Sequence, residues 1–451
     1  MYDLWLTGVK NTYEYEELVK VFLSPSEYRL SVGEGPEREK KEAMRELYRE
    51  LSSLTGRKPE WGTLTGVRPV KLAGELYERV KDKEKVKKIL EEEYLVDPVK
   101  SGLLVSVYMY QREVLKEPEE KTVGIYIGIP FCPTRCLYCS FTSNQASAVK
   151  IAGYMEALLL EIEFTGREME KAGMRPETVF VGGGTPTALP ADELLNLLCS
   201  INNSFDMAGV KEFTVEAGRP DTITPKKLKI MKSAGVTRVC VNPQSMLEKT
   251  LALIGRSHTP EDIREAFRAV RREGFGAVNM DVIAGLPEES EEDFMETVRE
   301  AAALGPENIT VHTLAVKRAS KLIDVDRDYH YGQAGRVGAM LSSCNRALAE
   351  KGYIPYYLYR QKHMAGNFEN VGWCKDGAAG IYNIRIMQEA QTVIALGAGG
   401  ITKVYYPDEN KLIRIPNVAN YELYISRIDE MIDRKKEKLF SGGRSNADKR
   451  A

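Results

Sequence analysis

The middle of the chain alternates short apolar runs with longer amphipathic stretches. Six runs have the length and β-branched content of buried strands, at 123–129, 178–181, 212–217, 238–242, 277–283 and 308–313. Five stretches between them have the apolar spacing of helices, at 154–172, 192–201, 225–234, 261–273 and 290–304. Strands that alternate with crossover helices pair in parallel. The pattern therefore predicts an α/β fold, with either an open, partial (β/α)6 barrel or an open doubly wound sheet.

The residues before this alternation have a different pattern. Residues 1–118 are predicted to form a small N-terminal α+β module, with strands near 4–9 and 28–32 and helices near 13–23, 37–54 and 81–93. One segment of the module concentrates Trp61, Gly62, Gly66, Arg68 and Pro69. We interpret that segment either as a loop packed on the helices or as an anion contact through Arg68.

The residues after the alternating strands and helices have a third sequence pattern. A tyrosine-rich stretch at 353–359 and a glycine-rich stretch at 391–403 lie between helices predicted near 335–351 and 420–436. We therefore predict three parts beyond the N-terminal module. They are the barrel at 119–330, a C-terminal region at 331–440 that covers the substrate, and a disordered tail at 441–451.

Charge and composition narrow the class of protein. The 63 basic and 65 acidic residues give a formal net charge of −2, which does not indicate a nucleic-acid partner. No apolar run approaches the roughly 20 residues of a membrane span, and the first residues lack the regions of a signal peptide. Seven cysteines, an odd number, favour ligation over a disulfide framework. A cytoplasmic location is expected.

Three of the cysteines, Cys132, Cys136 and Cys139, follow the first predicted strand with CxxxCxxC spacing. A four-iron cluster normally takes four thiolates, so three of them leave one iron open for a small chelating molecule. Half of a zinc site is the alternative, but no second CxxC or HxxxH pair completes it. Cys199 and Cys240 lie in apolar contexts and are predicted to be buried.

Glycine and polar residues mark the ends of the other predicted strands, where parallel-barrel enzymes place their chemistry. These residues are Gly182, Gly183, Gly184, Thr185, Glu216, Gln244 and Asp281. The glycines can bring backbone close to a ligand, and polar side chains among apolar strands need a partner. Arg238 either pairs with a surface carboxylate or serves the site, and His258 is expected to cap the helix that starts near 260.

These features resemble the radical S-adenosylmethionine (radical SAM) superfamily, in which a CxxxCxxC loop holds a [4Fe–4S] cluster and S-adenosylmethionine chelates the open iron. The resemblance implies the partial barrel. It also implies that Tyr126 lies beside the cluster-bound cofactor at the catalytic centre, and that Tyr138 is the usual aromatic residue before the last cysteine. The further cofactor contacts that it implies are Gly182, Gly183, Gly184, Thr185, Glu216, Gln244, Arg256 and Asp281, with Arg256 on the carboxylate and Gln244 and Asp281 on the ribose.

A branch of the superfamily is indicated by the strings GIYIGIPFC, VGGGTPT, VNPQS, IGRSH and DVIAGLP. They resemble the oxygen-independent coproporphyrinogen III oxidase (dehydrogenase) group, and WGTLTGVRP, HTLAVKRAS and ALGAG resemble its HemZ type. The resemblance implies a radical SAM oxidoreductase of heme biosynthesis. Such an enzyme converts two propionates of coproporphyrinogen III to vinyl groups through a 5′-deoxyadenosyl radical. A low-potential electron donor such as flavodoxin or ferredoxin is the implied partner.

A porphyrinogen or heme-like substrate with several carboxylates would need cations and aromatic faces. The candidates are Lys317 and Arg318 after the last predicted strand, and Arg360 and Lys362 among Tyr357, Tyr359 and Trp373. An ordinary aromatic hinge with solvated charges is the alternative.

Two positions depart from the better-known oxidases of this group. Gly128 stands at the histidine of YIHIPFC, and Phe141 stands where a fourth cysteine follows the cluster. The string CLYCSF is closer to the heme chaperone branch, which keeps the cluster but traffics heme. Two alternatives therefore stay open: a heme-binding chaperone or heme-modifying relative, and a cluster protein with an unrelated substrate.

Overall fold

The computed structural model describes residues 1–9, 11–139, 144–316, 320, 322, 329, 332–362 and 364–441. The chain divides into two compact units. Unit 1 comprises Met1–Val114, Ile283–Met295 and Val311–Cys374, and unit 2 comprises Leu115–Val282, Glu296–Thr310 and Lys375–Ala451. Among the described helices, none is long and apolar enough to cross a membrane. The tail predicted at 441–451 lies outside the described residues from 442 onward.

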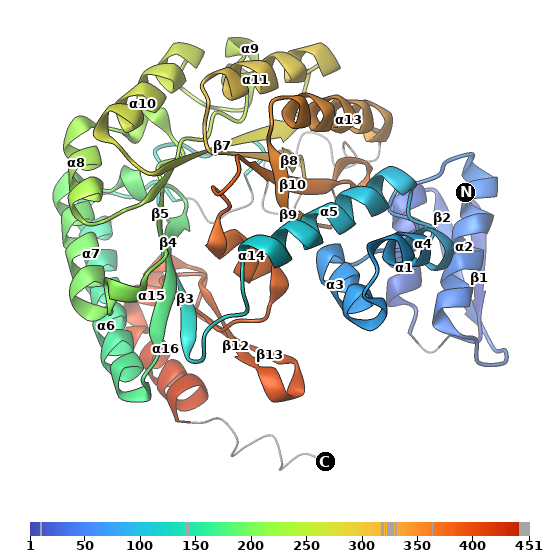
Figure 1. Cartoon of the computed structure of the whole chain (residues 1–451), viewed down its shortest axis with the longest axis horizontal. Coiled ribbons are helices and arrows are strands. Elements are labelled where there is room, and N and C mark those ends of the chain that lie inside the picture. The colour runs from blue at the N-terminus through green and yellow to red at the C-terminus, as the bar shows by residue number, and fades with distance from the viewer. Residues whose placement is uncertain are drawn as a thin grey trace. The chain divides into compact units, whose positions relative to one another are not determined.

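Unit 2 is built on parallel strands joined by helices (Figure 1). The strands, in sheet order, are β3 (Thr122–Ile129), β4 (Arg175–Gly183), β5 (Glu212–Glu216), β6 (Arg238–Cys240), β7 (Ala277–Ala284) and β8 (Asn308–Thr313). Pairing is parallel from β3 to β7. The helices are α6 (Ala148–Ala172), α7 (Ala191–Ser204), α8 (Pro225–Ser233), α9 (Glu248–Leu253), α10 (Pro260–Glu273) and α11 (Glu291–Ala303). Helices α6, α7, α8 and α10 follow the outer side of these strands in Figure 1, so the predicted partial barrel is confirmed.

The strands are apolar because both faces of the sheet are covered. In β3, for example, Ile125, Ile127 and Ile129 are fully buried. Strand β6 ends at Cys240, two residues earlier than predicted. The Val241 N–H still donates to the Asn279 carbonyl at 2.8 Å, but Gln244 has a φ of +66°, which turns the chain away from the strand direction.

The C-terminal residues of unit 2 extend the same sheet on the other side of β3. Strand β11 (Val393–Leu396) pairs in parallel with β3, and β12 (Ile401–Tyr406) and β13 (Lys411–Pro416) follow in antiparallel pairing. Helices α14 (Ile381–Gln388), α15 (Tyr421–Ser426) and α16 (Ile428–Lys435) complete the unit. Gly397, after β11, has a φ of +91°, and an added Cβ there would lie 2.5 Å from the Gly128 carbonyl oxygen. Only glycine fits this close approach.

A buried ionic network ties helix α16 to helix α6. Lys435 and Glu161 are both fully buried, and Lys435 Nζ lies 2.6 Å from Glu161 Oε1. Glu161 Oε2 accepts from the Tyr424 hydroxyl at 2.5 Å and from the Gly397 N–H at 2.7 Å. Asn417 bonds to both members of the ion pair, at 2.9 Å each. Burial alone would raise the pKa of Glu161, but Lys435 and the hydrogen bonds outweigh it and hold that pKa below its usual value.

Unit 1 combines the N-terminal residues with later segments. The N-terminal elements are β1 (Tyr2–Thr7), α1 (Tyr13–Phe22), β2 (Tyr28–Gly33), α2 (Lys40–Thr55), α3 (Pro69–Val80), α4 (Lys83–Glu93) and α5 (Pro98–Val114), with β1 and β2 paired in parallel. The later ones are α13 (Ala334–Glu350), β9 (Ile354–Arg360) and β10 (Glu369–Cys374), with β9 and β10 antiparallel. Helices α3 and α5 were not predicted. Helix α3 starts at Pro69, which suits a first helical turn, and α5 buries Lys100 and Gln111 on its apolar side.

The segment around Trp61 packs inside unit 1. The Trp61 side chain is 2 % exposed, and its Nε1–H donates to Glu369 Oε2 at 2.8 Å. Glu369 is fully buried and its Oε1 lies 2.5 Å from Lys100 Nζ. The Arg360 guanidinium lies 5.1 Å from the centre of the Trp61 ring. The packed-loop interpretation therefore describes this segment.

Candidate cofactor site

The cysteine loop begins directly after strand β3 and is fixed by main-chain hydrogen bonds. The Asn144 N–H donates to the Pro130 carbonyl at 2.9 Å, and the Cys132 N–H donates to the Asn144 carbonyl at 3.1 Å. Farther along, the Leu137 N–H donates to the Ile254 carbonyl at 2.9 Å. Residues 140–143, including Phe141, lie outside the described residues. The loop that carries the three thiols therefore lies at the carboxyl end of the parallel strands, as predicted.

Of the three cysteines, Cys136 is buried and Cys132 and Cys139 are half-buried. Cys132 Sγ lies 3.4 Å from Thr185 Oγ1. Burial, with a smaller contribution from the Cys139 and Cys136 thiols, raises the pKa of Cys132 to about 11. Across the described part of the chain, no three His, Cys, Asp or Glu side chains are grouped as they would be around a single metal ion. These surroundings favour the neutral thiol of Cys132 until a bound metal centre stabilises the thiolate.

Arg219 belongs to this site, although the sequence analysis did not single it out. The residue is 3 % exposed, and its Nη1 lies 3.8 Å from Cys136 Sγ and 2.9 Å from Thr134 Oγ1. The Asp221 carboxylate holds the guanidinium with contacts of 3.0 and 3.2 Å. A buried cation beside a sulfur stabilises its thiolate form. The string GRPD could have identified Arg219 from the sequence, because it places an arginine and its acidic partner just after strand β5.

The glycine segment after β4 is bonded to the cysteine loop. The Gly184 N–H donates to the Ile129 carbonyl and the Thr185 N–H donates to the Phe131 carbonyl, both at 2.8 Å. An added Cβ on Gly184 would lie 2.5 Å from the Phe131 oxygen and 3.0 Å from Cys132 Sγ. A side chain at residue 184 would therefore push the cysteine loop away from the strand ends.

We expect Gly184→Ala to lower the iron content of the purified protein roughly tenfold, because supports of metal ligands typically contribute 10- to 100-fold to metal binding. Iron and sulfide per chain, measured after anaerobic reconstitution, test this. The matched control is Gly209→Ala, because an added Cβ on Gly209 meets nothing within 4 Å. Equal iron content in the two variants would contradict the steric argument.

Glu216 faces the glycine segment from the end of strand β5. Its Oε2 accepts from the Gly183 N–H at 3.2 Å. Burial, followed by the negative charge of Asp281, raises the pKa of Glu216 to about 8. Asp281 itself accepts from Asn279 Nδ2 at 2.7 Å. Two neighbouring carboxyl groups of this kind attract a cationic group of a ligand.

Arg256 lies beside Tyr138 and the end of strand β6. Its Nη1 donates to the Asn242 carbonyl at 2.7 Å and to the Gly218 carbonyl at 3.1 Å, and its Nη2 donates to the Tyr138 hydroxyl at 3.2 Å. Arg256 is 8 % exposed. These contacts fix the orientation of its guanidinium, which is the requirement for directed binding of a carboxylate.

Several buried polar atoms near these residues have no hydrogen-bond partner in the described part of the chain. They are Gln244 Oε1, Asn242 Oδ1, Arg256 Nε and both ring nitrogens of His258. A buried polar atom without a partner costs about 1–3 kcal/mol, so a ligand that satisfies these atoms would bind favourably. Burial, with Arg256 and Arg219, lowers the pKa of His258 to about 4. The prediction that His258 caps helix α10 is wrong, because Thr259 and Asp262 form the capping box.

Tyr126 is held in a stack of aromatic rings. Its ring centre lies 6.2 Å from that of Phe180 at an interplanar angle of 18°, and Phe180 stacks on Tyr382 at 4.6 Å. An added Cβ on Gly183 would lie 3.4 Å from the Tyr126 hydroxyl, which places this hydroxyl beside the glycine segment. Burial raises the pKa of Tyr126 above its usual range, so the hydroxyl stays protonated.

Some of the predicted residues lie elsewhere than expected, and others lie outside the described residues. Arg238 pairs with Glu212, which is buried and not a surface carboxylate, at the start of strands β5 and β6. Cys199 is exposed on helix α7, whereas Cys240 is buried as predicted. Lys317 and Arg318 lie outside the described residues. Arg360 and Lys362 belong to unit 1, where both line a pocket.

The described residues fit an iron–sulfur cluster with a chelating cofactor. The donor set is three soft thiolates on one loop, which is the ligand type that iron–sulfur clusters take. The glycine segment leaves backbone exposed beside Cys132, where a Cβ would not fit. The buried side-chain amide oxygens of Asn242 and Gln244 have no hydrogen-bond partner in the described part of unit 2, and Glu216 and Asp281 add two neighbouring carboxyl groups.

Comparison with known proteins supports the same assignment. The radical SAM superfamily matches residues 126–301. The oxygen-independent coproporphyrinogen-III oxidase-like protein HemZ of Bacillus subtilis is 38% identical over 392 residues, which are 85% of this chain and 78% of that protein. The heme chaperone HemW of Mycobacterium tuberculosis is 30% identical over 267 residues, which are 58% of this chain and 64% of that protein.

A solved structure agrees on the fold. Coproporphyrinogen III oxidase (HemN) from Escherichia coli, a radical SAM enzyme, aligns with a TM-score of 0.57 at 21% identity, over 72% of this chain and 73% of that one. Proteins of the superfamily use a [4Fe–4S] cluster and S-adenosylmethionine. The chain therefore belongs to the radical SAM superfamily and, within it, to the HemZ-type group of oxygen-independent coproporphyrinogen III oxidase-like proteins.

Proposed function

We propose that this protein is an oxidoreductase that converts two propionates of coproporphyrinogen III to vinyl groups by oxidative decarboxylation. The observation that carries the radical SAM chemistry is the contact of the cysteine loop with the glycine segment, through Cys132, Gly184 and Thr185. The choice of substrate is supported by the similarity to HemZ over 85% of the chain.

The cluster would be held by Cys132, Cys136 and Cys139. When bound, the cluster and S-adenosylmethionine would supply a 5′-deoxyadenosyl radical for removal of a hydrogen atom from the propionate β-carbon. The carboxyl group would then leave as carbon dioxide, and the substrate would pass one electron to an external one-electron acceptor. Arg219 offsets negative charge on the thiolates from its position beside Cys136.

The remaining polar residues would orient S-adenosylmethionine. We assign the cofactor amino group to Glu216 with Gly182, Gly183, Gly184 and Thr185, the carboxylate to Arg256, and the ribose hydroxyls to Gln244 and Asp281. The buried Gln244 Oε1 has no partner in the described part of the chain, which supports a ligand contact there. Tyr126 and Tyr138 flank the bound cofactor, and the protonated Tyr126 hydroxyl can donate a hydrogen bond.

Binding of S-adenosylmethionine is expected to weaken as the pH falls from 8 to 6. Glu216 has a pKa of about 8, so lower pH neutralises the carboxylate that attracts the cofactor ammonium group. Proton competition predicts roughly tenfold or more weaker binding at pH 6 than at pH 8. Isothermal titration of the cluster-loaded protein measures this. Glu216→Gln should bind weakly with a flatter pH profile, and an unchanged slope in that variant would contradict the assignment.

The proposed reaction is tested by incubating reconstituted protein with S-adenosylmethionine, a low-potential reductant and coproporphyrinogen III. We expect 5′-deoxyadenosine together with a divinyl product that has lost two carbon dioxide molecules and four hydrogen atoms. In the cell, a flavodoxin or ferredoxin is the proposed electron donor. Formation of 5′-deoxyadenosine without a vinyl product would overturn the substrate while leaving the radical SAM chemistry intact.

A heme-binding role is the second candidate, and the similarity to the heme chaperone HemW over 58% of the chain favours it. A chaperone would take up heme stoichiometrically and would not cleave S-adenosylmethionine during that step. Titration of the cluster-loaded protein with heme, followed by analysis for 5′-deoxyadenosine, distinguishes the two roles.

A further inference from the structure

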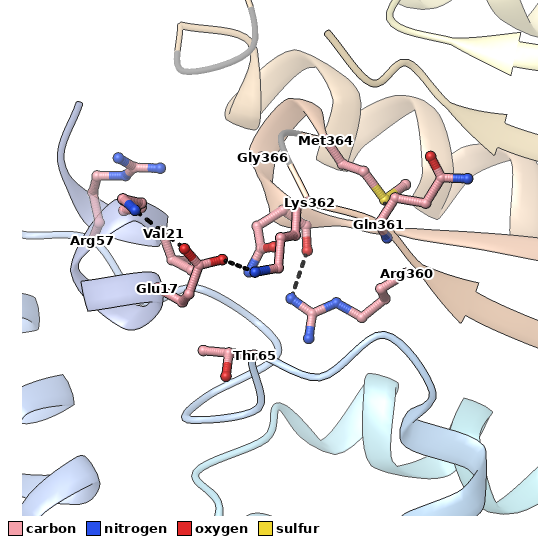
Figure 2. Close-up of a pocket in the computed structure, with 11 residues that line it drawn as sticks. Glu17, Val21, Arg57, Thr65, Arg360, Gln361, Lys362, Met364 and Gly366 are labelled. Carbon is pink, nitrogen blue, oxygen red and sulfur yellow. Dashed lines mark hydrogen bonds and ion pairs between the residues drawn. The ribbon is translucent and has the colours of Figure 1, made fainter. Parts of the chain in front are cut away.

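Unit 1 contains a pocket that lies outside the residues of the cofactor site (Figure 2). It is partly open to solvent, with a cavity volume of about 50 Å³. Its lining residues come from helix α1, from the segments near 57 and 65, and from the chain from the end of β9. All lining residues belong to unit 1, and none falls within residues 126–301, which match the superfamily. The pocket therefore lies outside the residues that match the superfamily, and it includes Arg360 and Lys362, two of the predicted substrate contacts.

The pocket wall carries an excess of positive charge. Its ionisable lining residues are Lys20, Arg57, Arg360, Lys362 and Glu17. The one carboxylate is already shared, because Glu17 Oε1 lies 3.2 Å from Lys20 Nζ and Glu17 Oε2 lies 2.9 Å from Lys362 Nζ. Four cations against one anion leave a formal charge of +3 on the lining side chains.

The two arginines have no carboxylate partner among the described residues. Arg57 Nη1 donates to the Phe22 carbonyl at 2.6 Å, and Arg360 donates to the carbonyls of Leu64 and Asn367. Arg360 is 2 % exposed, and burial lowers its pKa to about 10, so it still carries its charge at neutral pH. Its Nε has no hydrogen-bond partner in the described part of the chain. The charge of Glu369 offsets part of the cost of burying Arg360, and a bound anion would offset more of it.

Figure 2 shows Arg57 and Arg360 to either side of the Glu17–Lys362 ion pair. Guanidinium groups bind carboxylates and phosphates through paired hydrogen bonds, so two of them suit two acidic groups. Val21 and Met364 add apolar lining for the body of a ligand. We propose that this pocket binds a small molecule with at least two carboxylate or phosphate groups.

Isothermal titration of full-length, cluster-loaded protein with citrate and with pyrophosphate, at low salt, tests this proposal. We expect at least one probe to bind with a Kd below about 1 mM. Arg57→Gln should weaken that binding about tenfold, because it removes a charge-assisted hydrogen bond. Glu17→Gln should tighten it several-fold, because it removes the opposing charge. The preferred probe tells whether the acidic groups are carboxylates or phosphates.

The matched control is Arg49→Gln, an exposed arginine of helix α2 that does not line the pocket, and its binding should equal that of the unchanged protein. Circular dichroism checks that each variant is folded, and tighter binding by Glu17→Gln cannot arise from misfolding. The proposal is wrong if neither probe binds below about 10 mM, or if the Arg57 and Glu17 variants bind both probes as the Arg49 variant does. Because the probes are not porphyrins, this result is independent of the proposed reaction.

Discussion

Replacing Cys136 by serine is expected to reduce bound iron to background and to lower S-adenosylmethionine cleavage by a factor of at least about 100. This factor is a lower bound, because loss of a residue that only supports a metal ligand already lowers metal affinity or activity 10- to 100-fold. Cys136 is 8 % exposed and lies beside the Arg219 guanidinium, so no other thiol can replace its sulfur without moving the loop. Iron and sulfide analysis, with electron paramagnetic resonance of the reduced protein, measures the loss directly.

The matched control is Cys199→Ser. Cys199 is exposed on helix α7, outside the cysteine loop, so this variant should keep its cluster and its activity. If Cys136→Ser retained a full complement of iron and sulfide, the three-thiolate assignment would fail. If both variants lost iron equally, general damage to the protein would explain the result better than loss of a ligand.

Lys435→Met is expected to lower the free energy of unfolding by about 3–5 kcal/mol. The substitution leaves Glu161 buried without its cation, and breaking a buried ion pair on one side typically costs this amount. Urea unfolding, followed by circular dichroism, measures the change. Because the folded-state pKa of Glu161 is depressed, the contribution of the pair is present above the unfolded pKa and is lost as the pH falls through the folded value.

Two variants separate this effect from other causes. Lys150→Met breaks the Lys150–Glu422 pair, whose side chains are exposed, and should leave the stability nearly unchanged. The double variant Glu161→Leu/Lys435→Met removes both charges and should recover much of the loss. A loss below about 1 kcal/mol for Lys435→Met would mean that water already reaches the pair.

The parallel strands and the cysteine loop could be predicted because their signals are local. The β-branched run before Cys132 defines β3 without reference to the rest of the chain, and parallel pairing then places the carboxyl ends of successive strands at one edge. That rule brings Gly184 and Glu216 close to the thiols before any distance is known. Cys199 shows the weakness of local context, since apolar neighbours in sequence did not bury it.

Contacts between residues far apart in sequence could not be predicted in this way. The role of Arg219 depends on Cys136, which lies on another strand-end loop, and Lys435 lies 274 positions from its partner Glu161. Helix α5 was missed because Lys100 and Gln111 interrupt its buried side. Lys100 pairs with Glu369 of β10 and with Glu60, and Gln111 donates to the Tyr356 carbonyl of β9. A buried polar residue of this type looks like a solvent-facing residue until its partner is known.

Strand β3, which leads into the cysteine loop, pairs on one side with β4 and on the other with β11, near the end of the chain. During synthesis the ribosome therefore releases the cysteines long before it makes strand β11, the neighbour of β3 on that side. A pairing of such long range forms late in folding. Iron delivery to this protein is accordingly expected to follow translation, and a nascent chain stalled before residue 393 should acquire no stable metal centre.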